Sequence, residues 1–196
     1  MPSLYSTKGI VLNQIKYLNN SIIANIFTEK FGRQAFIIKG LRSKKSKIKA
    51  NLFQPLFLLD MEIYYKMNRN LQSVKEIKNI SPFSTIPYDY NKNAMAIFLA
   101  EVLYKTIKEE EANINLFEFL FNSIKLFDTL DNKFINFHLL FLINLSRYLG
   151  FYPNNNFSEY KVFFDLKNGE FVENDSSHFH IIDKKLSAEF QKLLDL

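Results

Sequence analysis

Five apolar runs follow one another in the first 80 residues, with no long helical pattern between them. Turn-forming residues separate the runs, among them Asn19-Asn20, Gly32 and Asn68-Arg69-Asn70. The runs cover residues 7–12, 21–28, 33–39, 54–66 and 71–80. Five strands in so short a stretch predict a small antiparallel β-barrel of the OB type.

The pattern changes after the pairs Ser81-Pro82 and Ile86-Pro87, which mark a linker. Apolar residues at helical spacing then predict three helices, over about residues 95–103, 116–127 and 133–149. The third helix is apolar on nearly every side, so we expect it to be the central, buried one. Gly150 is well placed as its C-terminal stop.

The last part of the chain mixes short strand patterns with one more helix. Residues 161–166 and 170–172 are strand-like, and Lys167-Asn168-Gly169 between them predicts a hairpin. An amphipathic helix follows, with apolar positions from Leu186 to Leu194. The predicted fold class is α+β, with an N-terminal OB-type antiparallel β-barrel (domain 1–80). A mostly α-helical domain (81–196) follows, with a metal-free hairpin near 160–172.

Composition narrows the class of protein and its compartment. The chain contains no cysteine, which excludes disulfides and thiolate metal sites and favours a reducing cytoplasm. The N-terminus lacks the charged and apolar regions of a signal peptide. The most apolar stretch, residues 137–151, is too short for a membrane span. We therefore expect a soluble, cytoplasmic protein that does not insert into membranes.

Charge divides the chain into two halves of opposite sign. Residues 1–80 contain 14 Lys and Arg against 4 Asp and Glu, a net +10, whereas residues 81–196 contain 11 against 16, a net −5. The densest segment, residues 39–49, has six positive charges and no acidic residue. Lys and Arg bind nucleic acid through phosphate attraction and counterion release. The candidate DNA-binding residues are Arg33, Lys39, Arg42, Lys44, Lys45, Lys47 and Lys49.

A solvated loop is the alternative interpretation of this segment, but the high charge of the whole barrel favours binding to a polyanion. The segment joins the third and fourth predicted strands. OB barrels usually bind through the face of strands 2 and 3 and through the loops after strands 1 and 4. Exposed rings can also stack nucleic-acid bases. The candidates are Tyr5, Tyr17, Phe31, Tyr64 and Tyr65.

No residue pattern predicts catalysis. The five glycines are scattered and form no phosphate-binding loop. The histidines are His138, on a predicted core helix, and His178 and His180, which alternate and could share one strand face without a third ligand. Residues 109–111 are consecutive glutamates, whose side chains diverge by about 100° on a helix. We expect no catalytic residue, metal or cofactor, and the chain is predicted not to be an enzyme.

The order of several segments is similar to that of one family. They include Gly9-Ile-Val-Leu12, residues 26–33 (IFTEKFGR), Lys39-Gly-Leu-Arg42, residues 98–103 (FLAEVL) and Leu149-Gly-Phe-Tyr-Pro153. Over roughly residues 4–165 the series resembles the bacterial recombination mediator and DNA repair family RecO. The resemblance implies an N-terminal OB domain, a C-terminal helical domain and a non-enzymatic role in recombinational repair by the RecF pathway.

The resemblance also implies a set of partners. Such proteins bind single- and double-stranded DNA, anneal complementary strands and help to load the RecA recombinase onto DNA coated by single-strand binding protein (SSB). They act with RecR, and many members also act with RecF and contact the SSB C-terminal tail. Many carry a four-cysteine zinc site after the Leu-Gly-Tyr-x-Pro segment, which a chain without cysteine cannot form. We expect packing or hydrogen bonds to hold that region here.

Two other classes remain open from the residues alone. One is an OB-domain RNA-binding or ribosome-associated protein. The other is a protein-interaction adaptor that acts through its acidic helical half. For the RecO-like reading we expect association with the nucleoid, and binding that is distributed over many lysines rather than dependent on one.

Overall fold

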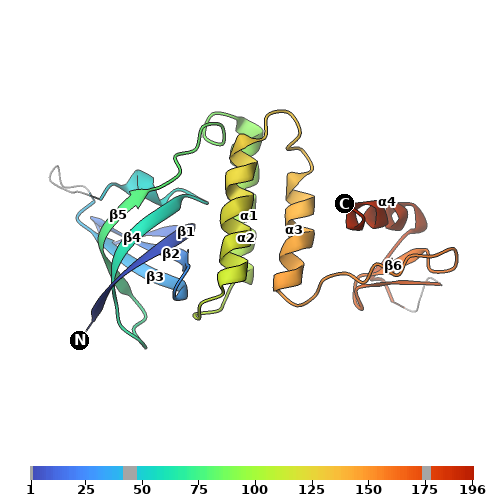
Figure 1. Ribbon diagram of the computed structural model, residues 1–196, viewed down its shortest axis with the longest axis horizontal. Helices are drawn as coiled ribbons and strands as arrows, with labels where there is room; N and C mark the ends of the chain where they lie inside the picture. The colour runs from blue at the N-terminus through green and yellow to red at the C-terminus, as the bar shows by residue number, and fades with distance from the viewer. Residues whose placement is uncertain (1, 42–47, 174–177) are drawn as a thin grey trace. The chain divides into compact units, whose positions relative to one another are not determined.

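The computed structural model describes residues 2–41, 48–173 and 178–196, from an N-terminal barrel through helices to a small sheet (Figure 1). The elements are β1 (Ser3–Tyr17), β2 (Ser21–Thr28), β3 (Gly32–Lys39), the 3-10 helix η1 (Ala50–Phe53), β4 (Leu58–Tyr65), β5 (Gln72–Asn79), α1 (Tyr90–Thr106), α2 (Ile114–Thr129), α3 (Phe137–Tyr148), β6 (Phe163–Asp165), β7 (Glu170–Val172), β8 (Ile181–Ile182) and α4 (Lys184–Leu194). They form two compact units, residues 1–134 and 135–196.

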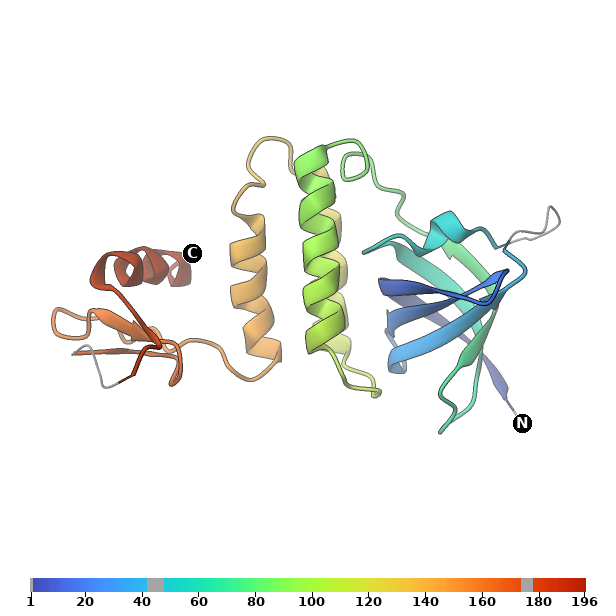
Figure 2. The ribbon, with the colours of Figure 1, turned by 180° about the vertical axis from the view of Figure 1, so that it is seen from behind.

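The five N-terminal strands pair in the cyclic order β1-β2-β3-β5-β4, so the sheet returns to its first strand (Figure 2). Strand β1 pairs with β4 over Ser3–Ile10 and with β2 from Gly9 onward. All pairs are antiparallel except β3 with β5, which meet in parallel at two residue pairs. This arrangement confirms the α+β class and the OB-type sheet expected from the sequence.

Alternating side chains of the strands fill the interior of this sheet. Ile22, Ala24 and Ile26 of β2 are buried, as is Phe36 of β3. Phe53 of η1 is fully buried in the same core. Each buried aromatic ring removes on the order of 150–250 Å² from water, so Phe36 and Phe53 contribute much of the stability of a small domain.

Strand β1 is much longer than the run predicted at residues 7–12. Both of its ends are exposed, and only the middle lies in the core. A bulge between Val11 and Asn13 also interrupts the alternation of side chains. Its exposed ends contain isolated apolar residues, such as Leu4, Ile15 and Tyr17, but no apolar run long enough to predict a strand.

Helices α1 and α2 belong to the same compact unit as the barrel. The Asp89 side chain accepts hydrogen bonds from the first turn of α1, and Asn113 does the same for α2. Phe117 of α2 lies 6.0 Å from Phe27 of β2, measured between ring centroids. The compact unit therefore extends past the predicted boundary at residue 80, and the division into domains 1–80 and 81–196 stays a prediction.

Asp128, at the end of α2, holds the linker that joins the barrel to the helices. Its carboxylate accepts hydrogen bonds from the backbone N–H groups of Ser84 (2.8 Å), Thr85 (2.9 Å) and Ile86 (3.0 Å). Burial alone would raise the pKa of Asp128, but hydrogen bonds from Ser84, Ile86 and Thr85 outweigh it and lower that pKa. The linker is thus fixed to an ionised side chain.

Lys92 of α1 completes this network from the other side. It is only 2% exposed, and its ammonium group donates to the Thr85 hydroxyl (2.7 Å) and to the carbonyls of Asp128 (3.2 Å) and Leu130. The same ammonium lies 5.2 Å from the centroid of the Phe134 ring. The contacts join the start of α1 to the end of α2, so the two helices run antiparallel.

Helix α3 differs from the expectation that it would be the central, buried helix, and that prediction is wrong. It spans Phe137–Tyr148, and its buried residues are Phe141, Leu145 and Ser146. Leu139 and Tyr148 are 37% and 39% exposed. Helices α1 and α2 carry more buried positions. Apolar composition around a helix does not show how many of its faces are covered by neighbouring elements.

The C-terminal sheet has the order β7-β6-β8, and α4 packs against β6. The predicted hairpin is confirmed, with β6 and β7 joined around Gly169 in the left-handed conformation (φ 70°). Phe164 contacts Phe171 and Phe190, with ring centroids 4.9 and 4.7 Å apart. The two-residue strand β8 was not predicted, because so short a strand has no detectable alternation.

Candidate nucleic-acid interface

The described ends of the basic segment are attached to the barrel. Lys39 is the last residue of β3 and is exposed. The backbone N–H groups of Gly40 and Leu41 donate to the carbonyl of Asn20 in the β1–β2 turn. At the other end, Ile48 packs against the barrel core and Lys49 is exposed. Four predicted site residues lie outside the described residues: Arg42, Lys44, Lys45 and Lys47.

This attachment refines the position expected from the sequence. The segment belongs to the β3–β4 connection, but its first residues are hydrogen-bonded to the turn after β1. The loop after strand 1 is one of the two loops that OB folds use for binding. Lys39 therefore lies beside the loop after strand 1, although sequence order places it outside the usual loops.

Arg33 has a different environment from the lysines. It begins β3 beside Gly32, whereas Lys39 ends the same strand, so the structure does not bring the two together. Its Nη1 donates to the carbonyls of Tyr104 and Ile107, both at 2.8 Å. Its guanidinium also lies 4.3 Å from the centroid of the Tyr104 ring. Arg33 thus fastens the end of α1 to the barrel.

Gly32 allows the α1–α2 loop to approach the start of β3 closely. Its φ is +61°, and a Cβ added there would overlap the carbonyl oxygen of Glu111 and lie 2.7 Å from that of Glu109. The backbone N–H of Arg33 donates to the Glu109 carbonyl at 2.9 Å. Only glycine permits this close approach of the α1–α2 loop to β3.

We expect Gly32→Ala to lower the free energy of unfolding by about 2–3 kcal/mol, because it adds a backbone clash to an unfavourable φ. Gly40→Ala is the matched control, since Gly40 also has a positive φ (75°) but no atom near the added Cβ. It should lose only about 1 kcal/mol. Urea denaturation measures both variants. Equal losses would show that the contact with the α1–α2 loop contributes nothing.

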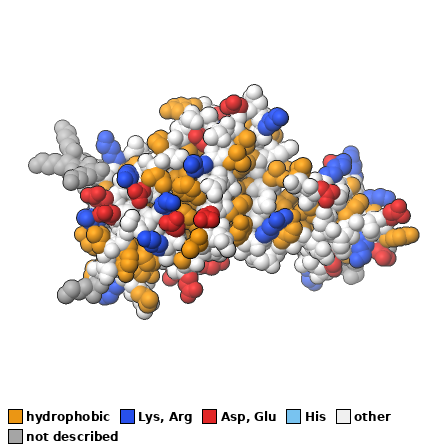
Figure 3. All heavy atoms as spheres, in the orientation of Figure 1, with side chains coloured by type: hydrophobic (Ala, Val, Ile, Leu, Met, Phe, Trp, Pro, Cys, Tyr) orange, Lys and Arg blue, Asp and Glu red, His pale blue; other side chains and the backbone are white. Residues whose placement is uncertain are grey.

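The basic residues elsewhere on the barrel fall into two groups. Lys8, Lys75 and Lys78 form ion pairs with Glu29 (3.6 Å), Glu62 (2.8 Å) and Asp60 (3.2 Å). On the face seen in Figure 3, acidic and basic side chains are accordingly interspersed over the barrel strands. Within the described ranges, the following exposed side chains of the barrel have no ion-pair partner: Lys16, Lys30, Lys39, Lys49, Lys66 and Arg69. These are the cations most available to phosphate.

The aromatic candidates also differ from one another. Phe31 stacks on Tyr65 with ring centroids 4.1 Å apart, and Tyr5 meets Phe31 edge-on at 5.1 Å. Tyr17 is 39% exposed and lies directly opposite Ser21, which in turn lies opposite Lys39. Directly opposed residues project from the same face of a sheet. Tyr17 and Lys39 therefore present a ring and a cation on one outer face of the barrel.

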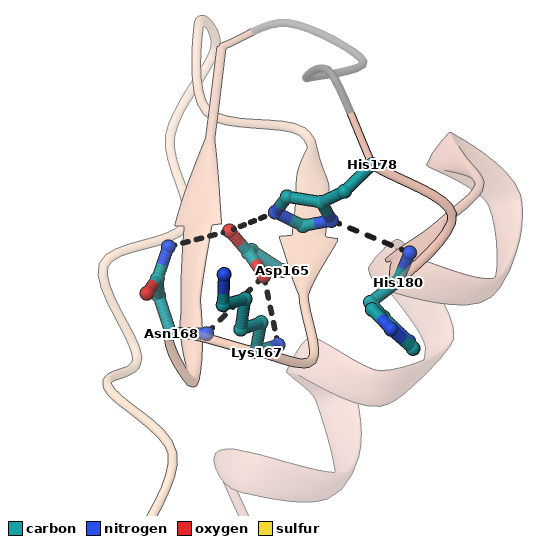
Figure 4. A network of polar contacts seen from close by, with 5 residues as sticks. All are labelled: Asp165, Lys167, Asn168, His178 and His180. Atoms are coloured by element: carbon teal, nitrogen blue, oxygen red, sulfur yellow. Dashed lines mark hydrogen bonds and ion pairs between the residues drawn. The ribbon is translucent and has the colours of Figure 1, made fainter.

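The histidines of the C-terminal unit do not form a strand face. His178 Nε2 lies 3.3 Å from Asp165 Oδ2, and the backbone N–H of His180 donates to His178 Nδ1 (Figure 4). Asp165 also accepts hydrogen bonds from Lys167 and Asn168 in the hairpin turn. Burial would raise the pKa of Asp165, but the hydrogen bonds from Asn168 and Lys167 lower it. The network stabilises the hairpin.

Neither a metal-binding cluster nor a membrane-spanning helix is found in the described part of the chain. No group of three or more His, Asp and Glu side chains there is arranged to hold a metal ion. No helix there is long and apolar enough to cross a bilayer. The glutamates at residues 109–111 are exposed in the loop between α1 and α2.

The chain matches two family models. Residues 1–83 match the N-terminal model of recombination protein O, and residues 87–158 match its C-terminal model. Curated relatives named DNA repair protein RecO include one from Bacteroides fragilis, 47% identical over 86% of this chain and 70% of the relative. Another, from Flavobacterium psychrophilum, is 38% identical over 97% of this chain and 79% of the relative. The chain belongs to the RecO family of DNA repair proteins.

Proposed function

We propose that this chain is a non-enzymatic recombination mediator of the RecF pathway. In this role it binds single-stranded DNA, promotes annealing of complementary strands and helps RecA to load onto SSB-coated DNA. The observation that carries the proposal is the set of exposed barrel cations that have no ion-pair partner among the described residues, of which Lys16 and Lys39 lie beside the β1–β2 turn, one of the loops that OB folds use for binding. Membership of a DNA repair family supports the same role.

The mechanism requires no bond-making residue. The barrel holds the phosphates of one strand through Lys39 and Lys49, together with Arg42, Lys44, Lys45 and Lys47. Because contacts to phosphate leave base edges free, a bound strand can still pair with its complement. The positive charge of the barrel also reduces repulsion between two approaching strands. Tyr17, on the same outer face as Lys39 with Ser21 of β2 between them, supplies a surface on which a base can stack.

Arg33 has a different role from the exposed lysines. Two backbone carbonyls already occupy its Nη1, so it acts first by holding the end of α1 against the barrel. We further propose that residues 1–80 handle DNA and that residues 81–196 serve protein partners. Those partners are RecR and, with it, RecF, RecA and the SSB tail. Double-stranded DNA is a second ligand of the barrel, and the protein acts in the cytoplasm at the nucleoid.

A strand-annealing assay tests the proposal. Two complementary labelled oligonucleotides should pair faster with the full chain than without it, both when naked and when coated with SSB. Single-stranded RNA of the same sequence is the comparison, because an RNA-binding protein should use the 2′-hydroxyl and prefer it. No acceleration of annealing on either form of DNA would contradict the mediator role.

A further inference from the structure

A polar pocket opens on the barrel at the end of β3 opposite to Lys39. Its volume is about 620 Å³, and it lies between the outer face of β2 and β3, the β4–β5 hairpin and the α1–α2 loop. Sites for small ligands typically enclose about 300–1,000 Å³. The strand 2–3 face and the loop after strand 4 are surfaces with which OB folds bind oligonucleotides. The pocket therefore lies where a bound strand would pass.

Hydrogen bonds within the chain hold the walls of the pocket in place. Gln72 fixes the β4–β5 hairpin, because its side-chain amide accepts from the Lys66 N–H and donates to the carbonyls of Lys66 and Arg69. On the opposite side, Arg33 and Gly32 hold the α1–α2 loop against β3. A pocket that is already formed loses little freedom when it binds.

The side chains that line the pocket suit a nucleobase. Asn25, Asn68 and Asn70 contribute amides, and Glu110 and Glu111 contribute carboxylates. In the part of the chain that the structure describes, none of these five side chains makes a hydrogen bond or ion pair, so their polar groups are available.

An aromatic wall completes this lining. Tyr65 borders the pocket and is braced by Phe31, on which it stacks. A flat heterocycle with donors and acceptors along its edge matches a site of amides, carboxylates and one ring.

Resting on the proposed DNA-binding function, we infer that this pocket receives one unstacked base of a bound single strand and favours bases with an exocyclic amino group. Carboxylates accept hydrogen bonds from the cytosine N4 amino group, whereas thymine presents a carbonyl oxygen at that position. The carboxylates of Glu110 and Glu111 disfavour a phosphate directly beside them and favour a hydrogen-bond donor there. Three cations line the pocket, Arg33, Arg69 and Lys108; Arg33 already donates to backbone carbonyls, so Arg69 and Lys108 can hold the flanking phosphates.

The pocket therefore differs in chemistry from the basic segment. The segment contacts backbone phosphates and does not distinguish sequences, while the pocket adds a preference for base type. Paired bases cannot enter it, so it also favours single strands over duplex.

Fluorescence anisotropy with labelled dC12 and dT12 oligonucleotides at one salt concentration tests the inference. The full chain should bind dC12 about tenfold more tightly than dT12, which is the discrimination expected of one good base contact. The double variant Glu110→Gln, Glu111→Gln keeps the shape of both side chains and should reduce the preference to about twofold or less. Glu118→Gln, at an exposed position of α2 that does not line the pocket, is the charge control and should keep it.

Asn68→Gly provides a second test that does not threaten the fold. Asn68 has a φ of 59°, a conformation that glycine adopts without strain, so the substitution removes the side chain and its amide without straining the backbone. Its affinity for dC12 should fall about threefold to tenfold. Equal binding of dC12 and dT12 by the unaltered chain would overturn the inference but leave DNA binding intact. Absence of binding to either oligonucleotide would overturn the proposed function as well.

Discussion

Replacing Lys39, Lys44, Lys45 and Lys49 together by glutamine is expected to weaken binding to single-stranded DNA by about 10²- to 10³-fold at 0.1 M salt. Each lysine that neutralises a phosphate contributes about 0.7 to the log–log dependence of affinity on salt, and at 0.1 M four such contacts amount to nearly three orders of magnitude. The loss should be similar for all sequences, because contacts to phosphate carry no sequence information.

A matched pair of double variants separates local binding from net charge. Lys39→Gln with Lys49→Gln removes two exposed lysines that have no ion-pair partner among the described residues, and should weaken binding about 25-fold at 0.1 M salt. Lys75→Gln with Lys78→Gln removes the same charge from the same barrel, but these lysines pair with Glu62 and Asp60. The control should lose much less affinity. Equal losses would mean that net charge alone, and not this end of the barrel, determines binding.

Asp128→Asn is expected to lower the free energy of unfolding by about 2–4 kcal/mol. The carboxylate accepts hydrogen bonds from three backbone N–H groups of the linker, one at Oδ2 and two at Oδ1. In the asparagine variant one of these two oxygens becomes an NH2 group, which donates and cannot accept, so at least one of the three hydrogen bonds is lost. The buried ammonium of Lys92 also lies in this network. Asp131→Asn is the control, at an exposed position just after α2, and should stay within about 0.5 kcal/mol of the unaltered chain. Urea denaturation at pH 7 compares them.

The dependence of stability on pH gives a second measure of the same network. The folded-state pKa of Asp128 lies below its ordinary value of 3.8, so the carboxylate contributes its full stabilisation above that value. This stabilisation is lost as the pH falls below 3.8 through the folded-state pKa. Asp128→Asn should therefore show a shallower loss of stability in acid than the unaltered chain. An identical acid profile in the two proteins would contradict the role assigned to Asp128.

The barrel could be predicted from the sequence because its turns and apolar runs are both local signals. Residues 21–28 and 33–39 were expected as strands, and the structure has β2 and β3 there with bounds that differ by at most one residue. The ends of β1 and the coverage of α3 could not be predicted in the same way. Both depend on which surfaces other elements cover, and a local pattern contains no such information.

The candidate interface was predictable only where it follows from charge along the chain. The basic segment is contiguous, so counting Lys and Arg along the chain is enough to identify it. The role of Arg33 depends on the end of α1, some 70 residues later in the chain. The pocket draws Asn25, Arg69 and Glu110 from three distant segments, and no spacing between them signals a site. The closeness of Gly40 to the β1–β2 turn likewise became visible only in the folded barrel.

The dependence of single-stranded DNA affinity on salt concentration tests the central claim most directly. If the barrel binds through six or seven phosphate contacts around Lys39 and Lys49, log affinity should fall against log salt with a slope of roughly −4 to −5. The quadruple lysine variant should show a slope shallower by about 3. Affinity that does not change with salt, or a variant whose slope equals that of the unaltered chain, would contradict the claim that this barrel handles DNA through its backbone charge.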